Sequence, residues 1–175
     1  MSIIVLIGRS GSGKSSIQKC LEEKGYKKVV MSTTRPKRDG EVEGVDYYFL
    51  SNEEWGLKVK EGRLADIAYY NDWGYGLEIP ENKDNLVICS TPAGMRSLKR
   101  SGYDIISVYI NVDQRVALIR SLERGDSIVE ACRRSISDLG QFDRVSEEVD
   151  IEVKNDFKKS IDEIVQEILN KISEL

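Results

Sequence analysis

Histidine is absent from the 175 residues of this chain, and cysteine is sparse. Without an imidazole, neither histidine acid–base catalysis nor a histidine-ligated metal is available. The three cysteines, Cys20, Cys89 and Cys132, are odd in number and far apart, which fits neither a disulfide framework nor a zinc-binding spacing. Any chemistry must therefore use carboxylates, lysine, arginine, hydroxyl groups or a substrate-borne Mg²⁺.

Long apolar runs and an excess of positive charge are also missing. No apolar run approaches the roughly 18 residues that a membrane span requires. The formal net charge of −4 provides no overall basic field for nucleic acid or a membrane surface. The N-terminus lacks the basic start and cleavage site of a signal peptide, so we expect a cytoplasmic protein. The length suits one domain with small insertions.

The strongest positive signal is a phosphate-binding loop near the N-terminus. The apolar run at 3–7 is typical of a strand buried on both faces. It leads into GRSGSGKS at 8–15, a full match to G-x-x-x-x-G-K-[ST], and residues 16–23 then have the apolar spacing of a helix. The glycines and the helix N-terminus would direct backbone N–H groups toward a polyphosphate. Lys14 would reach the β- and γ-phosphates, and the Ser15 hydroxyl would bind Mg²⁺.

Strand-like and helix-like segments alternate along most of the chain, which predicts an α/β fold with a parallel sheet. Residues 161–172 have the apolar stripe of a core-facing helix, which we expect Asn155 or Asp156 to cap. Between 32 and 80 the alternation stops, and short strands cluster around one helix. This pattern predicts a small β-rich insertion, with a turn or hairpin tip at 71–76.

Two arginines in a polar loop could bind a phosphate. Arg35 and Arg38 flank a proline, and guanidinium forks match phosphate oxygens bidentately. Tyr47 and Tyr75 could each add a hydroxyl donor. A solvated basic loop with core tyrosines would have the same composition, so both interpretations stay open at this point.

A second basic group, Arg120, Arg124, Arg133 and Arg134, falls on two predicted helices. These arginines either face solvent or belong to a mobile lid that closes on a transferring phosphate. Phosphoryl transfer needs positioning and neutralised charge more than covalent groups. A phosphate-binding loop, a lysine, a metal and converging arginines are therefore sufficient for it.

These residues carry a resemblance to the guanylate kinase family of nucleoside monophosphate kinases. The similar stretches, in the family's order and with nearly its spacing, are GRSGSGKSS (8–16), STTRPKRDGEVEGVDYYF (32–49), YG (75–76), LERG (122–125) and VKND (153–156). The second stretch is the most specific, because a chance phosphate-binding loop would not be followed by it. The resemblance extends from residue 3 to the end of the sequence.

The resemblance implies an α/β P-loop kinase core with a five-stranded parallel sheet, an inserted β-rich acceptor-binding lobe and a helical lid. The core would comprise residues 1–31, 81–123 and 138–175. The lobe would comprise residues 32–80, and the lid residues 124–137. ATP with Mg²⁺ would be bound by Gly8, Arg9, Ser10, Gly11, Ser12, Gly13, Lys14, Ser15, Ser16, Arg120 and Asn155, with Ser15 as the metal ligand. The acceptor would be bound by Arg35, Arg38, Tyr47, Asp66, Tyr75 and Thr91. The catalytic residues would be Lys14, Arg35, Arg124 and Arg134.

The positions that read the guanine base depart from the family pattern. Met31 stands where the family has a small hydroxyl residue, and Asp66 replaces the base-binding glutamate. Leu77 replaces the hydroxyl residue after YG, and Cys89 and Thr91 replace an aspartate pair. Since a site built to hydrogen-bond a base rejects the wrong base by about 10⁴ or more, these changes could remove most guanine preference. Asp66 could still accept a hydrogen bond from a base, or could be a solvated carboxylate.

Three functions remain open on the sequence. We favour ATP-dependent phosphoryl transfer to a nucleoside monophosphate, by default GMP or dGMP to GDP or dGDP, with relaxed or altered base choice. The second is a kinase for a phosphorylated sugar such as ribose 1,5-bisphosphate, because ribose bisphosphokinase also departs at the base-reading positions. The third is a non-catalytic binding module, although such guanylate-kinase-like domains usually have a damaged phosphate-binding loop. We expect small-molecule partners, no nucleic acid or membrane, and a monomer or homodimer.

Overall fold

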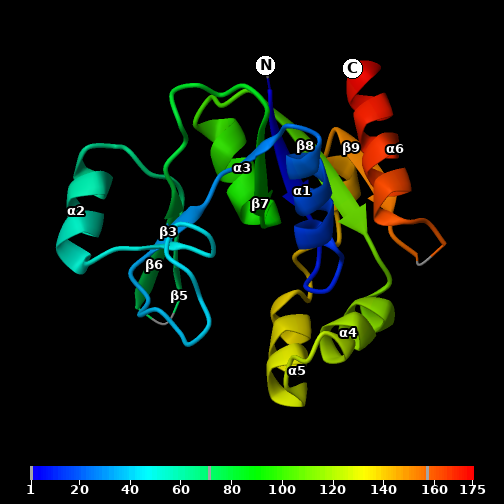
Figure 1. Ribbon diagram of the computed structural model, residues 1–175, viewed down its shortest axis with the longest axis horizontal. Coiled ribbons are helices and arrows are strands. Elements are labelled where there is room, and N and C mark those ends of the chain that lie inside the picture. The colour runs from blue at the N-terminus through cyan, green and yellow to red at the C-terminus, as the bar shows by residue number, and fades with distance from the viewer. Residues whose placement is uncertain (1, 71, 157) are drawn as a thin grey trace.

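A five-stranded, fully parallel sheet forms the centre of the computed structural model, which describes residues 2–70, 72–156 and 158–175 (Figure 1). The strand order is β2-β7-β1-β8-β9, so the first strand lies in the middle. The strands are β1 (Ile3–Ile7), β2 (Lys27–Lys28), β7 (Leu86–Ser90), β8 (Ile105–Asn111) and β9 (Ile151–Lys154). The predicted α/β fold with a parallel sheet is confirmed.

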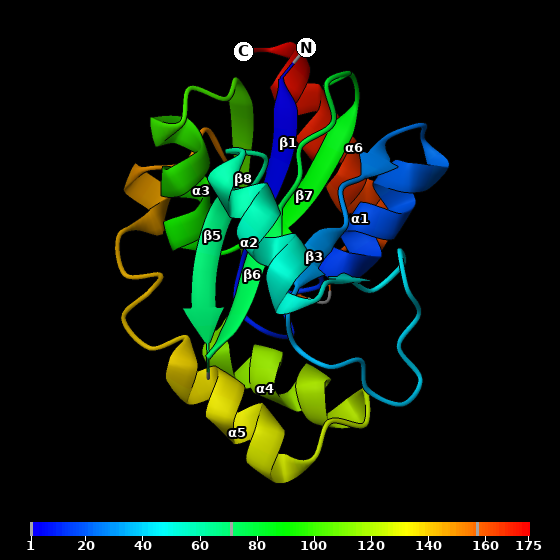
Figure 2. The same cartoon turned by 90° about the vertical axis from the view of Figure 1, so that its left-hand side faces the viewer.

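Helices cover both faces of this sheet, which explains why all five residues of β1 are buried (Figure 2). Ile3, Val5 and Ile7 pack with Met95 and Leu98 of α3 (Pro92–Arg100). Alternate side chains of a strand point to opposite faces. Ile4 and Leu6 accordingly join the cluster formed by α1 (Lys14–Glu23) and α6 (Ile161–Ser173) on the other face.

A second, four-stranded sheet lies beside the first and carries its own helix (Figure 1). Its order is β4-β3-β6-β5, with β3 (Met31–Thr33), β4 (Tyr48–Phe49), β5 (Ala65–Tyr70) and β6 (Trp73–Leu77). The helix is α2 (Asn52–Lys60), which Ser51 and Glu54 start with a capping box. The expected clustering of short strands around one helix between 32 and 80 is therefore observed.

The hairpin tip predicted at 71–76 is confirmed in part: β5 and β6 pair antiparallel with Tyr70 opposite Trp73, but residues 73–77 already belong to β6, which also pairs with β3. Asn71 lies outside the described residues. The glycines that suggested a turn instead make room for Trp55 of α2. A Cβ on Gly74 would lie 2.5 Å from the Trp55 ring, and one on Gly76 would lie 3.2 Å from it.

Two further helices, α4 (Gln114–Glu123) and α5 (Ile128–Ser137), lie together beyond one end of the main sheet (Figure 1). A short 3₁₀ turn, η1 (Val145–Glu147), follows them.

The predicted cap of the last helix is wrong: Ser160 caps α6 and forms a capping box with Glu163. Asn155 is buried and contacts the loop after β1 instead. None of the helices in the described ranges is both long and apolar enough to cross a membrane.

Candidate active site

The loop between β1 and α1 has a backbone that only glycine accommodates at two points. Gly11 and Gly13 have φ angles of +79° and +95°, in the left-handed region that L side chains rarely adopt. A Cβ on Gly11 would lie 2.1 Å from the carbonyl oxygen of Ala117, and one on Gly13 would lie 2.6 Å from Asn155 Nδ2. Conformation and space therefore both require glycine in this loop.

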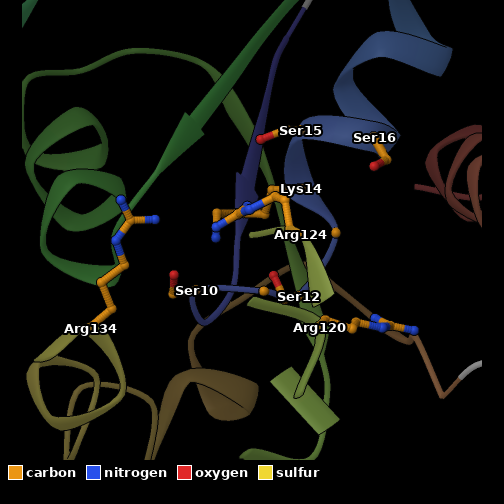
Figure 3. Close-up of a pocket in the computed structure, with 10 residues that line it drawn as sticks. Ser10, Ser12, Lys14, Ser15, Ser16, Arg120, Arg124 and Arg134 are labelled. Carbon is orange, nitrogen blue, oxygen red and sulfur yellow. The ribbon is translucent and has the colours of Figure 1, made fainter. Parts of the chain in front are cut away.

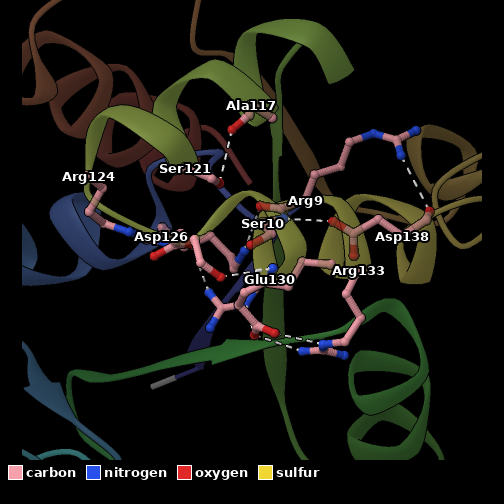
Figure 4. A network of polar contacts seen from close by, with 12 residues as sticks. Arg9, Ser10, Ala117, Ser121, Arg124, Asp126, Glu130, Arg133 and Asp138 are labelled. Atoms are coloured by element: carbon pink, nitrogen blue, oxygen red, sulfur yellow. Dashed lines mark hydrogen bonds and ion pairs between the residues drawn. The ribbon is translucent and has the colours of Figure 1, made fainter.

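Side chains from distant parts of the chain hold the loop in place (Figure 4). Asn155 Nδ2 donates to the carbonyl oxygen of Ser12 at 2.8 Å, and the Ser10 N–H donates to Asp138 Oδ2 at 2.8 Å. Arg9 donates to the carbonyl oxygen of Asp138 at 3.3 Å, and its guanidinium lies 5.0 Å from the ring centre of Phe142. Arg9 thus faces the segment after α5, away from the pocket described next.

A pocket of about 400 Å³ opens over this loop (Figure 3). The residues that line it are Ser10, Gly11, Ser12, Gly13, Lys14, Ser15, Ser16, Arg120, Arg124 and Arg134. Lys14 Nζ donates to the carbonyl oxygens of Gly8 and Arg9, at 2.5 and 3.0 Å. Burial lowers the pKa of Lys14. Of the residues predicted to bind ATP, Gly8, Arg9 and Asn155 support the loop without lining this pocket.

Carboxylates hold two of the lining arginines at the pocket edge. Arg124 pairs with Asp126 at 2.6 Å, and Arg134 pairs with Asp126 at 3.5 Å and with Glu130 at 2.8 Å. Hydrogen bonds from Arg133 and Arg134 lower the pKa of Glu130 to about 2. Arg133 binds Glu130 but does not line the pocket, so the structure separates it from the other three arginines of that sequence group.

A second pocket, of about 350 Å³, meets the first at Lys14. Its lining residues are Lys14, Met31, Tyr47, Asp66, Ala68, Tyr75, Cys89, Ser90 and Thr91. Four of the predicted acceptor-binding residues are among them, and Thr91 Oγ1 also accepts the N–H of Gly94 and so caps α3. Burial raises the pKa of Cys89 to about 11, which favours the protonated thiol near neutral pH.

Arg35 and Arg38, the other two predicted acceptor residues, do not line either of these two pockets. Arg35 is only 4% exposed and pairs with Glu41 at 2.6 Å. Its guanidinium lies 5.5 Å from the ring centre of Tyr47, which lines the second pocket. Arg38 is exposed, and its backbone N–H donates to Glu41 at 2.8 Å.

Sequence reasoning missed three residues of this region. Ser90 lines the second pocket and donates to Asp66 Oδ2 at 2.8 Å. Asp138 binds the phosphate-binding loop, and Glu41 neutralises Arg35. Two of them had a local signal: Ser90 is a polar residue that continues an apolar strand, and Glu41 follows Arg35 by only six residues.

A family model, curated relatives and a solved structure name the guanylate kinases. The family model described as Guanylate kinase matches residues 1–174. A guanylate kinase of Symbiobacterium thermophilum is 31% identical over 163 residues, covering 88% of this chain and 77% of the relative. One of Rubrobacter xylanophilus is 30% identical over 181 residues, covering 97% and 94%. The crystal structure of guanylate kinase from Anaplasma phagocytophilum superposes with a TM-score of 0.67 at 24% identity, covering 99% of this chain and 85% of that one.

Proposed function

The chain belongs to the guanylate kinase family, and we propose that it transfers the γ-phosphoryl group of ATP to a nucleoside monophosphate, with GMP and dGMP as the default acceptors. The fold is that of a P-loop kinase, and the family makes the protein a phosphotransferase. The observation that carries the proposal is that Lys14 lines two adjoining pockets. One pocket suits a polyphosphate donor and the other suits an acceptor.

The donor pocket fits ATP with Mg²⁺ on the chemistry of its residues. Its floor is a loop in which a Cβ at Gly11 or Gly13 would collide with neighbouring atoms, so backbone N–H groups can approach a polyphosphate closely. Ser15 is exposed at the start of α1, where its hydroxyl would hold Mg²⁺. When bound, the ion neutralises charge on the phosphoryl oxygens. Lys14, Arg120, Arg124 and Arg134 supply the protein's own positive charge around the same space.

The protein residues would act by positioning and by neutralising charge. An ionised acceptor phosphate is already nucleophilic, so no protein base is required. This agrees with a chain that has no histidine. Lys14 and the lid arginines Arg124 and Arg134 would stabilise the charge on the transferring group. Arg35, next to Tyr47, would orient the acceptor phosphate.

We propose that this acceptor pocket discriminates less between bases than a pocket with the family's usual base-reading residues. Met31, Ala68 and Cys89 make part of its wall apolar, and Asp66 is its one carboxylate within the described residues. A base edge that faces these apolar side chains finds no hydrogen-bond partner there. A site rejects a wrong base when that base leaves the site's own polar groups unpaired, and these apolar side chains have no such groups. Asp66 still favours bases that present an N–H donor.

An assay of ADP release at saturating ATP and Mg²⁺ across GMP, dGMP, IMP, AMP, CMP and ribose 1,5-bisphosphate tests this proposal. We expect turnover of GMP and dGMP, with discrimination against other monophosphates below the ~10⁴ of a fully hydrogen-bonded base site. No turnover with any nucleoside monophosphate would refute it. Turnover of ribose 1,5-bisphosphate without GMP would identify a sugar-phosphate kinase instead.

Gly11→Ala should abolish nucleotide binding in the donor pocket. The added Cβ would meet the Ala117 carbonyl oxygen, so the loop must move out of its phosphate-binding shape. Gly102→Ala is the matched control, because Gly102 has a φ of +76° and nothing within 4 Å of an added Cβ. Both variants should lose about 1–2 kcal/mol from the unfavourable φ alone. Only Gly11→Ala should lose the rise in melting temperature on adding ATP and Mg²⁺; an equal rise in both variants would count against the assigned donor site.

A further inference from the structure

Three features of the fold hold the carboxylate of Asp66. Its backbone has a φ of +50°, at an irregularity in the pairing of β5 with β6 between Ala65 and Ala68. Its Oδ2 accepts a hydrogen bond from Ser90 Oγ at 2.8 Å. A Cβ on Gly94, in the first turn of α3, would lie 2.2 Å from the same oxygen. The carboxylate therefore occupies a notch between the end of β7 and the start of α3.

Ser90 occupies a position where packing alone favours an apolar side chain. It follows four apolar residues of β7, in a sheet covered by helices on both faces, and it is only 8% exposed. A buried hydroxyl must find a partner to offset its lost hydration. Its partner is Asp66, whose pKa burial raises and the Ser90 hydrogen bond lowers. Ser90 thus favours the charged, hydrogen-bond-accepting form of Asp66.

We propose that Ser90 is a positioning residue for recognition of the acceptor base. Its hydroxyl fixes Oδ2 of Asp66, which leaves Oδ1 to accept an N–H from the base. Within the described residues, no hydrogen bond to Oδ1 competes with that contact. The acceptors favoured are those whose base presents an N–H donor at this edge, such as guanine or hypoxanthine. The inference rests on the proposed function, because it places the base in the second pocket.

The chain offers a matched control in the same sheet. Ser107, in the middle of β8, is also a buried strand serine whose hydroxyl donates to an aspartate, Asp150. It lies two strands from β7 and lines neither pocket. Ser90→Ala and Ser107→Ala therefore remove the same kind of hydrogen bond, one at the acceptor pocket and one away from it.

Calorimetric titration with GMP, together with steady-state kinetics, tests the proposal. Ser90→Ala should weaken GMP binding and raise the KM for GMP about tenfold, the loss expected for one hydrogen bond to a charged group. The KM for ATP and kcat should change less than twofold, and Ser107→Ala should change none of these. In an Asp66→Asn background, Ser90→Ala should have no further effect on GMP binding, because Ser90 acts through the carboxylate. Melting temperatures show whether each variant is folded.

The outcomes separate this inference from the proposed function. GMP binding that is equal in the wild type and in Ser90→Ala overturns the role of Ser90 and leaves the kinase activity untouched. A wild type that binds GMP but turns over no nucleoside monophosphate refutes the proposed function, while the binding data still decide the role of Ser90. A wild type that does not bind GMP overturns both. Equal losses from Ser90→Ala in the wild-type and Asp66→Asn backgrounds would show that Ser90 does not act through Asp66.

Discussion

Lys14→Ala lowers kcat for phosphoryl transfer by about 10³-fold, the scale of losing a preorganised positive group at a transferring phosphate. Lys14 is the residue shared by the two pockets, so its ammonium lies where donor and acceptor would meet. Burial lowers its pKa, and the carbonyl oxygens of Gly8 and Arg9 orient it. A charge that the protein holds in place stabilises a transition state more strongly than a mobile, hydrated charge.

Lys19→Ala is the control for this prediction. Lys19 is on the same helix, α1, but is exposed to solvent, and it lines neither pocket. It should retain the wild-type kcat within about twofold, because surface substitutions away from special features have small effects. Rates come from ADP release at saturating ATP, Mg²⁺ and GMP. A Lys14→Ala enzyme that keeps more than a tenth of the wild-type kcat would contradict the role assigned to Lys14.

Arg35→Ala lowers kcat/KM for the monophosphate acceptor by about 10²–10³-fold, because it removes a buried positive charge beside the acceptor pocket. Its guanidinium lies against the ring of Tyr47, which lines the acceptor pocket. The substitution also leaves Glu41 without its ion-pair partner. Arg35→Lys should recover only part of the loss, because a lysine keeps the charge but not the planar fork. The KM for ATP should stay near the wild-type value.

Arg63→Ala is the matched control in the same β-rich region. Arg63 pairs with Glu78 at the surface and lines neither pocket.

Removing one partner of a buried ion pair destabilises a protein by about 3–5 kcal/mol, so melting curves must accompany the Arg35 kinetics. Activity is then compared below the melting temperature of each variant. A folded Arg35→Ala enzyme with unchanged kcat/KM for GMP would show that Arg35 serves the lobe's structure and not the acceptor.

The features that the sequence predicts correctly depend on neighbours within a few residues. The apolar run at 3–7 forms the buried strand β1, and the residues after the glycine-rich loop form α1, as their apolar spacing indicates. In each case the interaction that fixes the structure is local, so composition and spacing are sufficient to identify it.

The features that the sequence does not predict depend on partners far along the chain. Gly74 and Gly76 have the composition of a turn, but they serve in β6 because Trp55 packs on them. Asn155 has the composition of a helix cap, but its amide instead supports a loop more than 140 residues earlier. Asp138 contacts the Ser10 N–H across 128 residues, and no local pattern marks that contact. Tertiary contacts override local preference at each of these positions.

Arg35 shows the same limit inside the candidate site. Its position beside a proline predicts a guanidinium fork offered from a rigid loop. The structure instead buries it against Tyr47 and pairs it with Glu41, only six residues on. The pairing could be suspected from sequence, but the burial could not, because it depends on the aromatic rings that β4 and β6 bring together.

Phosphorus NMR of the protein with ATP, Mg²⁺ and GMP tests most directly the claim that Lys14 joins a donor pocket to an acceptor pocket. The spectrum distinguishes transfer from hydrolysis, because transfer consumes the single phosphorus signal of GMP, whereas hydrolysis leaves that signal unchanged and adds inorganic phosphate. We predict that GMP is converted to GDP as ATP is consumed, with inorganic phosphate remaining at background, and that Lys14→Ala stops both changes. ATP converted to ADP and inorganic phosphate with GMP unchanged, or no change in either nucleotide, would contradict the account.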